Sequence, residues 1–189
     1  MSAVADEYLR PARPDDLPAL LALRAEATRW LRDRGSDQWS DARTGPVALE
    51  KWRRVVEQGN TWVVVDSVGG DALATVSRGS ADVDFWTADD RPESAFYLDK
   101  LIVARRAAGR RLGERVVDWA CGVAEREGRA WVRVDVWRTN PRLHAYYERL
   151  GFTHVRTCVH PGRRSGWLAQ RAAATRTVPD APLTARGGV

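Results

Sequence analysis

Apolar residues recur along this chain at two spacings, one typical of helices and the other of strands. Spacings of three and four positions, bounded by acidic or proline starts and glycine ends, predict amphipathic helices. These helices are expected over residues 14–34, 46–58, 109–127 and 141–149. Stretches rich in β-branched and aromatic residues predict strands over 8–12, 61–65, 72–77, 96–103, 130–137, 152–159 and 166–171. The second and third of these strands flank Gly69-Gly70 and are expected to form a hairpin.

The order of these elements predicts an α/β fold, because strands and helices alternate along the chain. The length of 189 residues suits one domain, since a domain usually has roughly 100 to 200 residues. We expect this single domain to cover residues 1–171. The segment 172–189 consists mostly of small residues with Pro179 and Pro182, and is expected to be a flexible tail. The polar, acidic stretch 82–92 is expected to be a loop that attracts cations.

Composition places the chain among globular proteins, with 44% hydrophobic and 29% charged residues. No apolar run approaches the roughly 18 residues that span a bilayer, and the first ten residues lack the apolar region of a secretory signal. We therefore expect a cytoplasmic protein with no membrane partner. Cys121 and Cys158 match no metal-ligand spacing, which predicts two reduced thiols and no metal site.

The charge balance raises the question of nucleic-acid binding. Thirty basic and 25 acidic residues give a net charge of +5 and an isoelectric point of about 9.7. However, the arginines are mostly scattered among acids, and only Lys51 and Lys100 are lysines. We expect no nucleic-acid partner, and a nucleic-acid binder stays as an alternative whose affinity would collapse with salt.

The segment from Leu98 to Gly113 carries the clearest chemical signal. An apolar strand runs into a loop with Gly109 and Gly113, and a long amphipathic helix follows. The first N–H groups of a helix have no partner within it and carry partial positive charge, so such a loop favours an anion. Four arginines add positive charge there: Arg105, Arg106, Arg110 and Arg111. A plain turn with solvated arginines is the competing interpretation.

A second segment, Asn140 to Phe152, places Leu143, Tyr147 and Leu150 on one face of a short helix. The neighbouring Tyr146 points about 100° away. Packing alone would explain two adjacent tyrosines.

Together the two segments resemble the GNAT-type acetyltransferase superfamily, which transfers an acetyl group from acetyl-coenzyme A to an amine. The resemblance covers roughly residues 8–171 and rests on Leu101-Ile102-Val103, the loop 108–113, Asn140 and the run from Tyr147 to Phe152. The family loop usually reads Arg/Gln-x-x-Gly-x-Gly/Ala. Here Gly109, Leu112 and Gly113 fit, whereas Ala108 and Arg111 replace the first and middle residues. The N-terminal stretch 10–17 is loosely similar to that of bacterial members.

The resemblance implies a mixed, mostly antiparallel central sheet of about six to seven strands flanked by about four helices. It also implies that the backbone of Leu101, Ile102 and Val103 pairs with the pantetheine amides of acetyl-coenzyme A. The pyrophosphate contacts would come from Ala108, Gly109, Arg110, Arg111, Leu112 and Gly113. Asn140 would be a further coenzyme contact. Tyr147 would be the general acid that protonates the leaving thiolate, with Tyr146 as its substitute.

An acceptor amine must lose a proton before it attacks, because alkylamines have pKa values near 10.4. Asp99 and Asp135 lie on neighbouring predicted strands and are the candidate bases, although each is also suited to a structural hydrogen bond. His144 has a suitable pKa, but we favour a surface role for it.

The family places a substrate-facing loop between its first two helices, which here contains Trp30, Asp37 and Trp39. Trp39 and Asp37 are expected to bind an ammonium by cation–π and ion-pair contacts, although packing would also explain such tryptophans. The function expected is therefore N-acetylation of a small-molecule or peptide amine, with a homodimer possible. The alternative is a non-catalytic module that binds acyl-coenzyme A.

Overall fold

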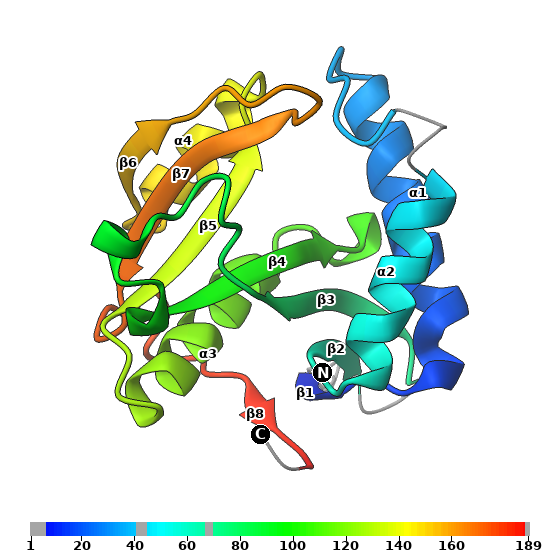
Figure 1. The fold of residues 1–189 in the computed structure, drawn as a ribbon. Helices are drawn as coiled ribbons and strands as arrows, with labels where there is room; N and C mark the ends of the chain where they lie inside the picture. Colours follow the sequence, from blue (N-terminus) through cyan, green and yellow to red (C-terminus); the bar gives the residue numbers. More distant parts are fainter. Residues whose placement is uncertain (1–6, 41–44, 67–69, 188–189) are drawn as a thin grey trace. The chain divides into compact units, whose positions relative to one another are not determined.

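The strands and helices of the computed structural model follow the predicted order (Figure 1), and the structure describes residues 7–40, 45–66 and 70–187. The strands are β1 (Glu7–Pro11), β2 (Thr61–Asp66), β3 (Ala72–Gly79), β4 (Ala95–Val103), β5 (Trp131–Trp137), β6 (Thr153–Thr157), β7 (Ser165–Ala172) and β8 (Thr184–Ala185). The helices are α1 (Leu17–Arg32), α2 (Gly45–Glu57), α3 (Leu112–Arg126) and α4 (Pro141–Arg149). Short 3-10 turns lie at Pro14–Asp16, Ala88–Asp90, Pro92–Ser94 and Arg105–Ala107.

Hydrogen bonds connect the strands in the order β6-β7-β5-β4-β3-β2-β1-β8. The β1–β2, β2–β3, β5–β7 and β6–β7 pairs are antiparallel, whereas β4–β5 and β1–β8 are parallel. The predicted mixed, mostly antiparallel α/β sheet is therefore confirmed, with one strand more than expected. The additional strand, β8, has two residues, which is too short to leave a pattern in the sequence. The turn at 67–69 of the predicted hairpin lies outside the described residues.

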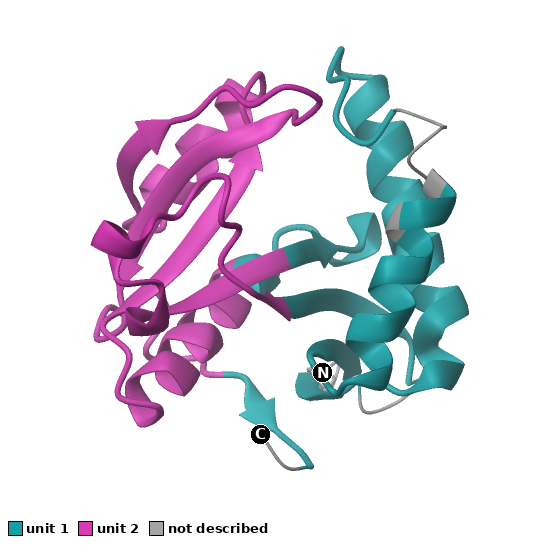
Figure 2. Cartoon of the chain, viewed as in Figure 1, with its two compact units in different colours: residues 1–77, 100–113, 183–189 teal, residues 78–99, 114–182 magenta. Residues whose placement is uncertain are grey.

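The chain forms two compact units (Figure 2). One unit contains residues 1–77, 100–113 and 183–189, and the other contains residues 78–99 and 114–182. In the first unit the middle of β2 is fully buried, as are Leu9 on β1 and Leu20 on α1. In the second unit a buried cluster joins Phe85, Trp86, Tyr97 and Leu168. Among the described residues, no helix is both long enough and apolar enough to cross a membrane.

Helix α3 begins later than the sequence predicted. We expected it to begin at Gly109, but its first residue is Leu112. Gly109 has a φ of 85° and Arg111 a φ of 56°, so both residues adopt left-handed conformations that a right-handed helix excludes. The three residues before the helix therefore end the loop and do not form a first helical turn.

The segment after β7 makes more contacts than its composition indicates. Ala173, Val178 and Leu183 are buried. The backbone N–H groups of Thr177 and Val178 each donate to the carboxylate of Asp118 on α3, with a shortest distance of 2.7 Å in both cases. The expectation of one domain over 1–171 with a tail after it stays a prediction.

A buried ion pair completes this attachment. Arg171 on β7 is 1% exposed, and its Nη2 donates to Oδ1 of Asp118 at 2.6 Å. We predict that Asp118→Asn lowers the free energy of unfolding by about 3 to 5 kcal/mol, because it leaves the Arg171 charge buried without a counter-ion. Urea denaturation measures this difference. The double variant Asp118→Asn with Arg171→Met, which removes both charges but keeps an acceptor for the N–H groups of Thr177 and Val178, is expected to recover most of the loss. A loss below about 1 kcal/mol, the size typical of a surface pair, would contradict this account.

Candidate active site

The candidate site in the second unit begins where β4 and β5 stop pairing. Their parallel ladder pairs Ala95–Tyr97 with Trp131–Arg133. Continued in the same register, the next pairs would be Leu98 with Val134 and Asp99 with Asp135, and neither is part of the ladder that the described residues form. A strand edge without a neighbour presents backbone N–H and C=O groups to any extended ligand. The two predicted bases therefore follow directly after the point where the strands separate.

Asp135 is the more buried of the two candidate bases. Its Oδ2 accepts a hydrogen bond from the Ser165 hydroxyl at 3.2 Å, whereas its buried Oδ1 has no partner among the described residues. Burial raises the pKa of Asp135 to about 6, and this rise exceeds the opposing effect of the Ser165 hydrogen bond. The charges of Asp82 and Arg163 also act on it, in opposite directions. A carboxylate with this pKa suits proton abstraction near neutral pH. Asp99, in contrast, is exposed.

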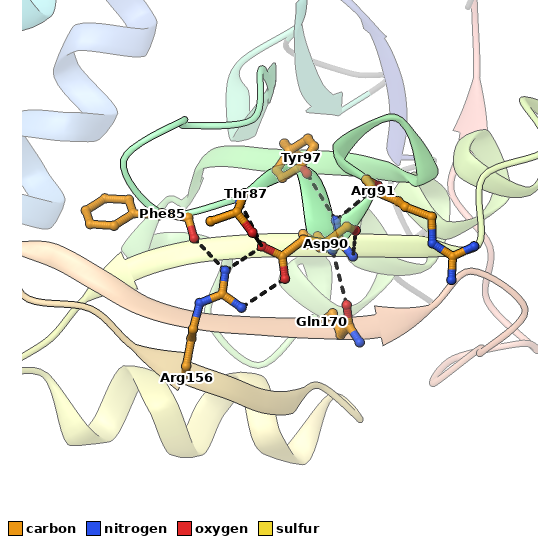
Figure 3. A network of polar contacts seen from close by, with 8 residues as sticks. Phe85, Thr87, Asp90, Arg91, Tyr97, Arg156 and Gln170 are labelled. Atoms are coloured by element: carbon orange, nitrogen blue, oxygen red, sulfur yellow. Dashed lines mark hydrogen bonds and ion pairs between the residues drawn. The ribbon is translucent and has the colours of Figure 1, made fainter.

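The acidic stretch that precedes β4 is held against this sheet by arginines. Arg156 on β6 donates to both carboxylate oxygens of Asp90, at 2.9 and 2.5 Å, and to the carbonyl of Phe85 (Figure 3). These contacts hold the pKa of the Asp90 carboxyl well below its usual range. Arg133 on β5 donates to the hydroxyl of Tyr97 at 3.2 Å and to the carbonyl of Asp90 at 2.8 Å.

The same pattern continues at the start of this acidic stretch. Arg163 forms ion pairs with Asp82 and Asp84, the latter at 3.0 Å. The acids at positions 82, 84 and 90 therefore serve mainly to fix the loop beside Asp135. The expectation that this loop attracts a cation is weakened, because arginines of the same unit neutralise these three carboxylates.

Tyr147 lies on the buried face of α4, as its spacing predicted. Its side chain is 5% exposed, and its ring packs edge-on against Phe152, with 5.1 Å between ring centroids. Burial raises its pKa far above the ordinary value, and the charges of Tyr146 and Asp99 raise it further. The phenol therefore stays protonated at neutral pH, which is the form that a general acid needs. Burial also raises the pKa of Tyr146, to about 12.

Asn140 and His144 have local roles in the structure. Asn140 is the N-cap of α4, where its Oδ1 accepts a hydrogen bond from the N–H of Leu143 at 3.1 Å. His144 Nε2 lies 2.8 Å from the carbonyl of Trp137, and its ring stacks on Trp167. These contacts give His144 a structural role, in line with our preference against its acting as a base.

In the first unit, the loop after β4 leaves open space around its glycine. A Cβ atom added to Gly109 would have no heavy atom within 4 Å. Leu112 begins α3 directly afterwards, so the first N–H groups of this helix adjoin the loop. The predicted backbone contacts Leu101, Ile102 and Val103 lie at the end of β4, and the loop starts with the 3-10 turn Arg105–Ala107. This loop and helix start have the form of an anion site.

The arginines of this loop have partners within the protein. Arg106 donates to the carbonyl of Ala72 at 2.9 Å, and Arg110 pairs with Glu7 at 3.0 Å. The guanidinium of Arg105 lies over the ring of Trp30, 4.3 Å from its centroid. The sequence argument placed all four arginines toward a bound anion. In the structure these three side chains instead fasten the loop, which leaves backbone N–H groups as its main anion donors.

The predicted acceptor residues lie at the end of α1 and just after it. The guanidinium of Arg34 also lies over the Trp30 ring, at 4.2 Å, so Trp30 already has two cationic neighbours. Trp39 is half-buried, has a φ of 63° and lies near Arg24, at 5.7 Å. A bulky residue with positive φ is uncommon and often marks a functional segment. Asp37 is half-buried in the same loop.

Both cysteines are free thiols, Cys121 buried and Cys158 half-buried, and burial raises the pKa of Cys121 to about 11. Within the described ranges, no group of three or more histidine, cysteine, aspartate and glutamate residues is arranged to hold a metal ion.

Sequence reasoning missed several residues around the site. Ser165 reaches Asp135 from β7, and Glu26 on α1 accepts the backbone N–H of Arg105 at 2.9 Å. Gly166 leaves no room for a side chain, because a Cβ there would collide with the carbonyl oxygen of Cys158. These contacts join residues far apart in sequence, and the spacing of residue types gives no signal for them.

Comparisons with known proteins give a consistent result. The model of the acetyltransferase (GNAT) family matches residues 23–152. The chain is 31% identical over 147 residues to the uncharacterized N-acetyltransferase YesJ of Bacillus subtilis, covering 77% of this chain and 81% of that protein.

Solved structures share the fold at lower identity. A GNAT-family acetyltransferase from Listeria monocytogenes has a TM-score of 0.71 at 22% identity, covering 90% of this chain and 98% of that one. The PaiA N-acetyltransferase from Thermoplasma acidophilum, solved in complex with coenzyme A, has a TM-score of 0.66 at 14% identity, with 88% and 98% covered.

Proposed function

Because this chain belongs to the acetyltransferase (GNAT) family, and is therefore an acyltransferase, we propose that it transfers an acetyl group from acetyl-coenzyme A directly to a primary amine. The observation that carries the proposal is the end of the β4–β5 ladder at Tyr97 and Arg133, directly before Asp99 and Asp135. This separation opens the strand edges beside two carboxylates, one of them with a pKa near neutrality.

The residues present fit acetyl-coenzyme A. The backbone of Leu101, Ile102 and Val103 would pair with the pantetheine amides as an added strand does. Within residues 108–113, the N–H groups of Gly109, Arg111, Leu112 and Gly113 would hold the pyrophosphate, since Gly109 is open and α3 starts at Leu112. The N–H groups of Ala108 and Arg110 donate to carbonyls within the loop. Ala108 and Arg111 depart from the usual family residues, but backbone donors do not depend on the side chain. The coenzyme A complex of the Thermoplasma relative supports this use of the fold.

The transfer itself needs one base and one acid. The amine nitrogen attacks the thioester carbonyl carbon, the C–S bond breaks, and the proton that nitrogen loses passes to the Asp135 carboxylate. The departing thiolate takes the phenolic proton of Tyr147, with Tyr146 as the substitute donor. Asp99, which is exposed, is the alternative base. Asn140 remains proposed as a coenzyme contact in addition to its role as a helix cap.

The acceptor is proposed to be a small-molecule or peptide amine that Asp37 and Trp39 contact after α1. Two guanidinium groups lie over Trp30, at 4.2 and 4.3 Å, whereas one lies over Trp39, at 5.7 Å. We therefore assign the ammonium to Trp39, whose ring is the less occupied of the two. Homodimerisation, a cytoplasmic location and the absence of nucleic-acid and membrane partners stay predictions.

Calorimetric titration with acetyl-coenzyme A tests the proposal, with free adenine nucleotide as the control. We expect micromolar binding that requires the pantetheine arm, followed by turnover on at least one amine of a broad panel. Binding without turnover on that panel would favour the alternative, an acyl-coenzyme A-binding module. No detectable binding would contradict both, and binding of nucleic acid that weakens with salt would then favour the remaining alternative.

A further inference from the structure

The start of the loop after β4 is fastened to helix α1 by two contacts within the first unit. The carboxylate of Glu26 accepts the backbone N–H of Arg105 at 2.9 Å. One helical turn later, the ring of Trp30 lies under the guanidinium of the same arginine, with 4.3 Å between Cζ and the ring centroid. Residues four apart share one side of a helix, so Glu26 and Trp30 hold Arg105 by its backbone and by its side chain together.

The carboxylate of Glu26 accepts a backbone N–H, that of Arg105, which has no partner within its own 3-10 turn. Arg105 begins the 3-10 turn Arg105–Ala107, whose own hydrogen bond comes from the N–H of Ala108 to the carbonyl of Arg105. The first N–H of such a turn has no partner within it. On the next residue, the Arg106 guanidinium donates to the carbonyl of Ala72. The loop is therefore fixed at its start, while Gly109 in its middle is open.

Residues 33–40, which follow helix α1, are held to the helix by a hydrogen bond and a cation–π contact. Gly35, with a φ of 76°, ends the helix, and the N–H of Ser36 donates back to the carbonyl of Leu31 at 3.0 Å. The guanidinium of Arg24 lies 5.7 Å from the ring centroid of Trp39, so the segment folds back along the helix. A displacement of α1 therefore also moves Asp37 and Trp39.

The geometry points to Glu26 and Trp30 as positioning residues that couple the coenzyme loop to the acceptor segment. When coenzyme A binds to residues 108–113, the open middle of the loop loses its remaining motion, and through the contacts of Arg105 with Glu26 and Trp30 helix α1 and residues 33–40 lose motion with it. Order in the coenzyme loop is thereby coupled to order in the acceptor segment, and each ligand favours binding of the other. The inference rests on the proposed function, because it takes residues 108–113 as the coenzyme loop and 37–39 as acceptor contacts.

Hydrogen–deuterium exchange of the full chain, with and without coenzyme A, tests this coupling. In the unaltered protein, we expect coenzyme A to slow exchange both in residues 104–113 and in residues 24–38. In the double variant Glu26→Ala with Trp30→Leu, which removes both the acceptor and the ring, we expect slower exchange in the loop alone. The protection lost from α1 should be roughly fivefold, which is the size that one exposed cation–π contact provides.

Arg34→Gln is the matched control, because Arg34 lies over the same Trp30 ring but contributes nothing to the loop. It is expected to leave both protected regions as in the unaltered protein. If the double variant fails to fold, Trp30→Leu alone removes the ring under the Arg105 guanidinium and is expected to reduce the protection of α1. Absence of protection in the loop of the unaltered protein would contradict the coenzyme site itself. Protection of the loop without protection of α1, or α1 protection that survives the double variant, would overturn only the coupling.

Discussion

Asp135→Asn is expected to lower kcat by roughly 10² to 10⁴, the range that a positioned general base provides, while making the folded protein more stable at pH 7. The amide keeps the shape of the carboxylate and its contact with Ser165, but it accepts no proton from the attacking amine. The two effects have opposite signs because the feature that suits Asp135 to catalysis, its burial, also makes its charge costly.

The direction of the stability effect follows from proton linkage. Burial raises the folded-state pKa of Asp135 to about 6, above the value of about 4 for an exposed aspartate. The folded state therefore binds the proton more tightly, and the free energy of unfolding decreases as the pH rises from about 4 to about 6. A shift of roughly two pKa units corresponds to at most about 3 kcal/mol. The amide side chain of the variant is uncharged at every pH, so this loss is absent from it.

Melting curves at pH 4 and pH 7, together with pH–rate profiles, measure both effects. The gain in melting temperature should be present at pH 7 and largely absent at pH 4. In the unaltered enzyme, kcat/KM should fall about tenfold for each pH unit below about 6. The variant Asp99→Asn tests the alternative base. If that variant loses turnover while Asp135→Asn keeps it, the base is Asp99 and the assignment to Asp135 is wrong.

Tyr147→Phe is expected to lower kcat by about 10² to 10⁴ and to leave the affinity for acetyl-coenzyme A unchanged. Removing the hydroxyl leaves the ring packed against Phe152 and Tyr146, so the fold should persist. Burial raises the pKa of Tyr147, so the phenol is protonated at pH 7. Steady-state rates and calorimetric titration of the same preparation separate the loss of turnover from a loss of binding.

Tyr146→Phe is the matched control for this change, because it removes an equivalent hydroxyl from the adjacent residue. We expect it to retain most of its activity. Loss of turnover in Tyr146→Phe with retention in Tyr147→Phe would transfer the acid role to Tyr146. Weaker coenzyme binding by Tyr147→Phe would instead indicate that this side chain acts in binding.

The helices and strands were largely predictable because their signals are local. The apolar spacing from Leu17 onward identified α1, and the β-branched run from Thr61 identified β2. The misplaced start of α3 has a different cause, because the left-handed conformation of Arg111 has no signature in its residue type. β8 was missed because a two-residue strand exists only through its pairing with β1.

The residue types of the candidate site were predictable from the sequence, but their burial and their charge partners were not. The family resemblance indicated Tyr147, and the need for a base on neighbouring strands indicated Asp99 and Asp135. Nothing in the sequence showed which of the two aspartates is buried. Their difference comes from burial, since Asp135 is enclosed beside Ser165 whereas Asp99 is exposed. The sequence predicted that the acidic stretch 82–92 attracts cations. It gave no sign that Arg156 and Arg163 neutralise these acids, because the two arginines lie about 70 to 80 positions farther along the chain.

The sequence by itself determined the order of the elements and the family, because periodicity and short motifs are written in neighbouring residues. The tertiary structure decided which charges are neutralised, which carboxylate is buried, and where Glu26 and Trp30 hold Arg105. Those properties depend on the dielectric surroundings and on distances of a few ångströms between segments far apart in the chain. Only folding brings such groups together, so only the structure shows which candidate residues are buried, which are exposed and which fasten a loop.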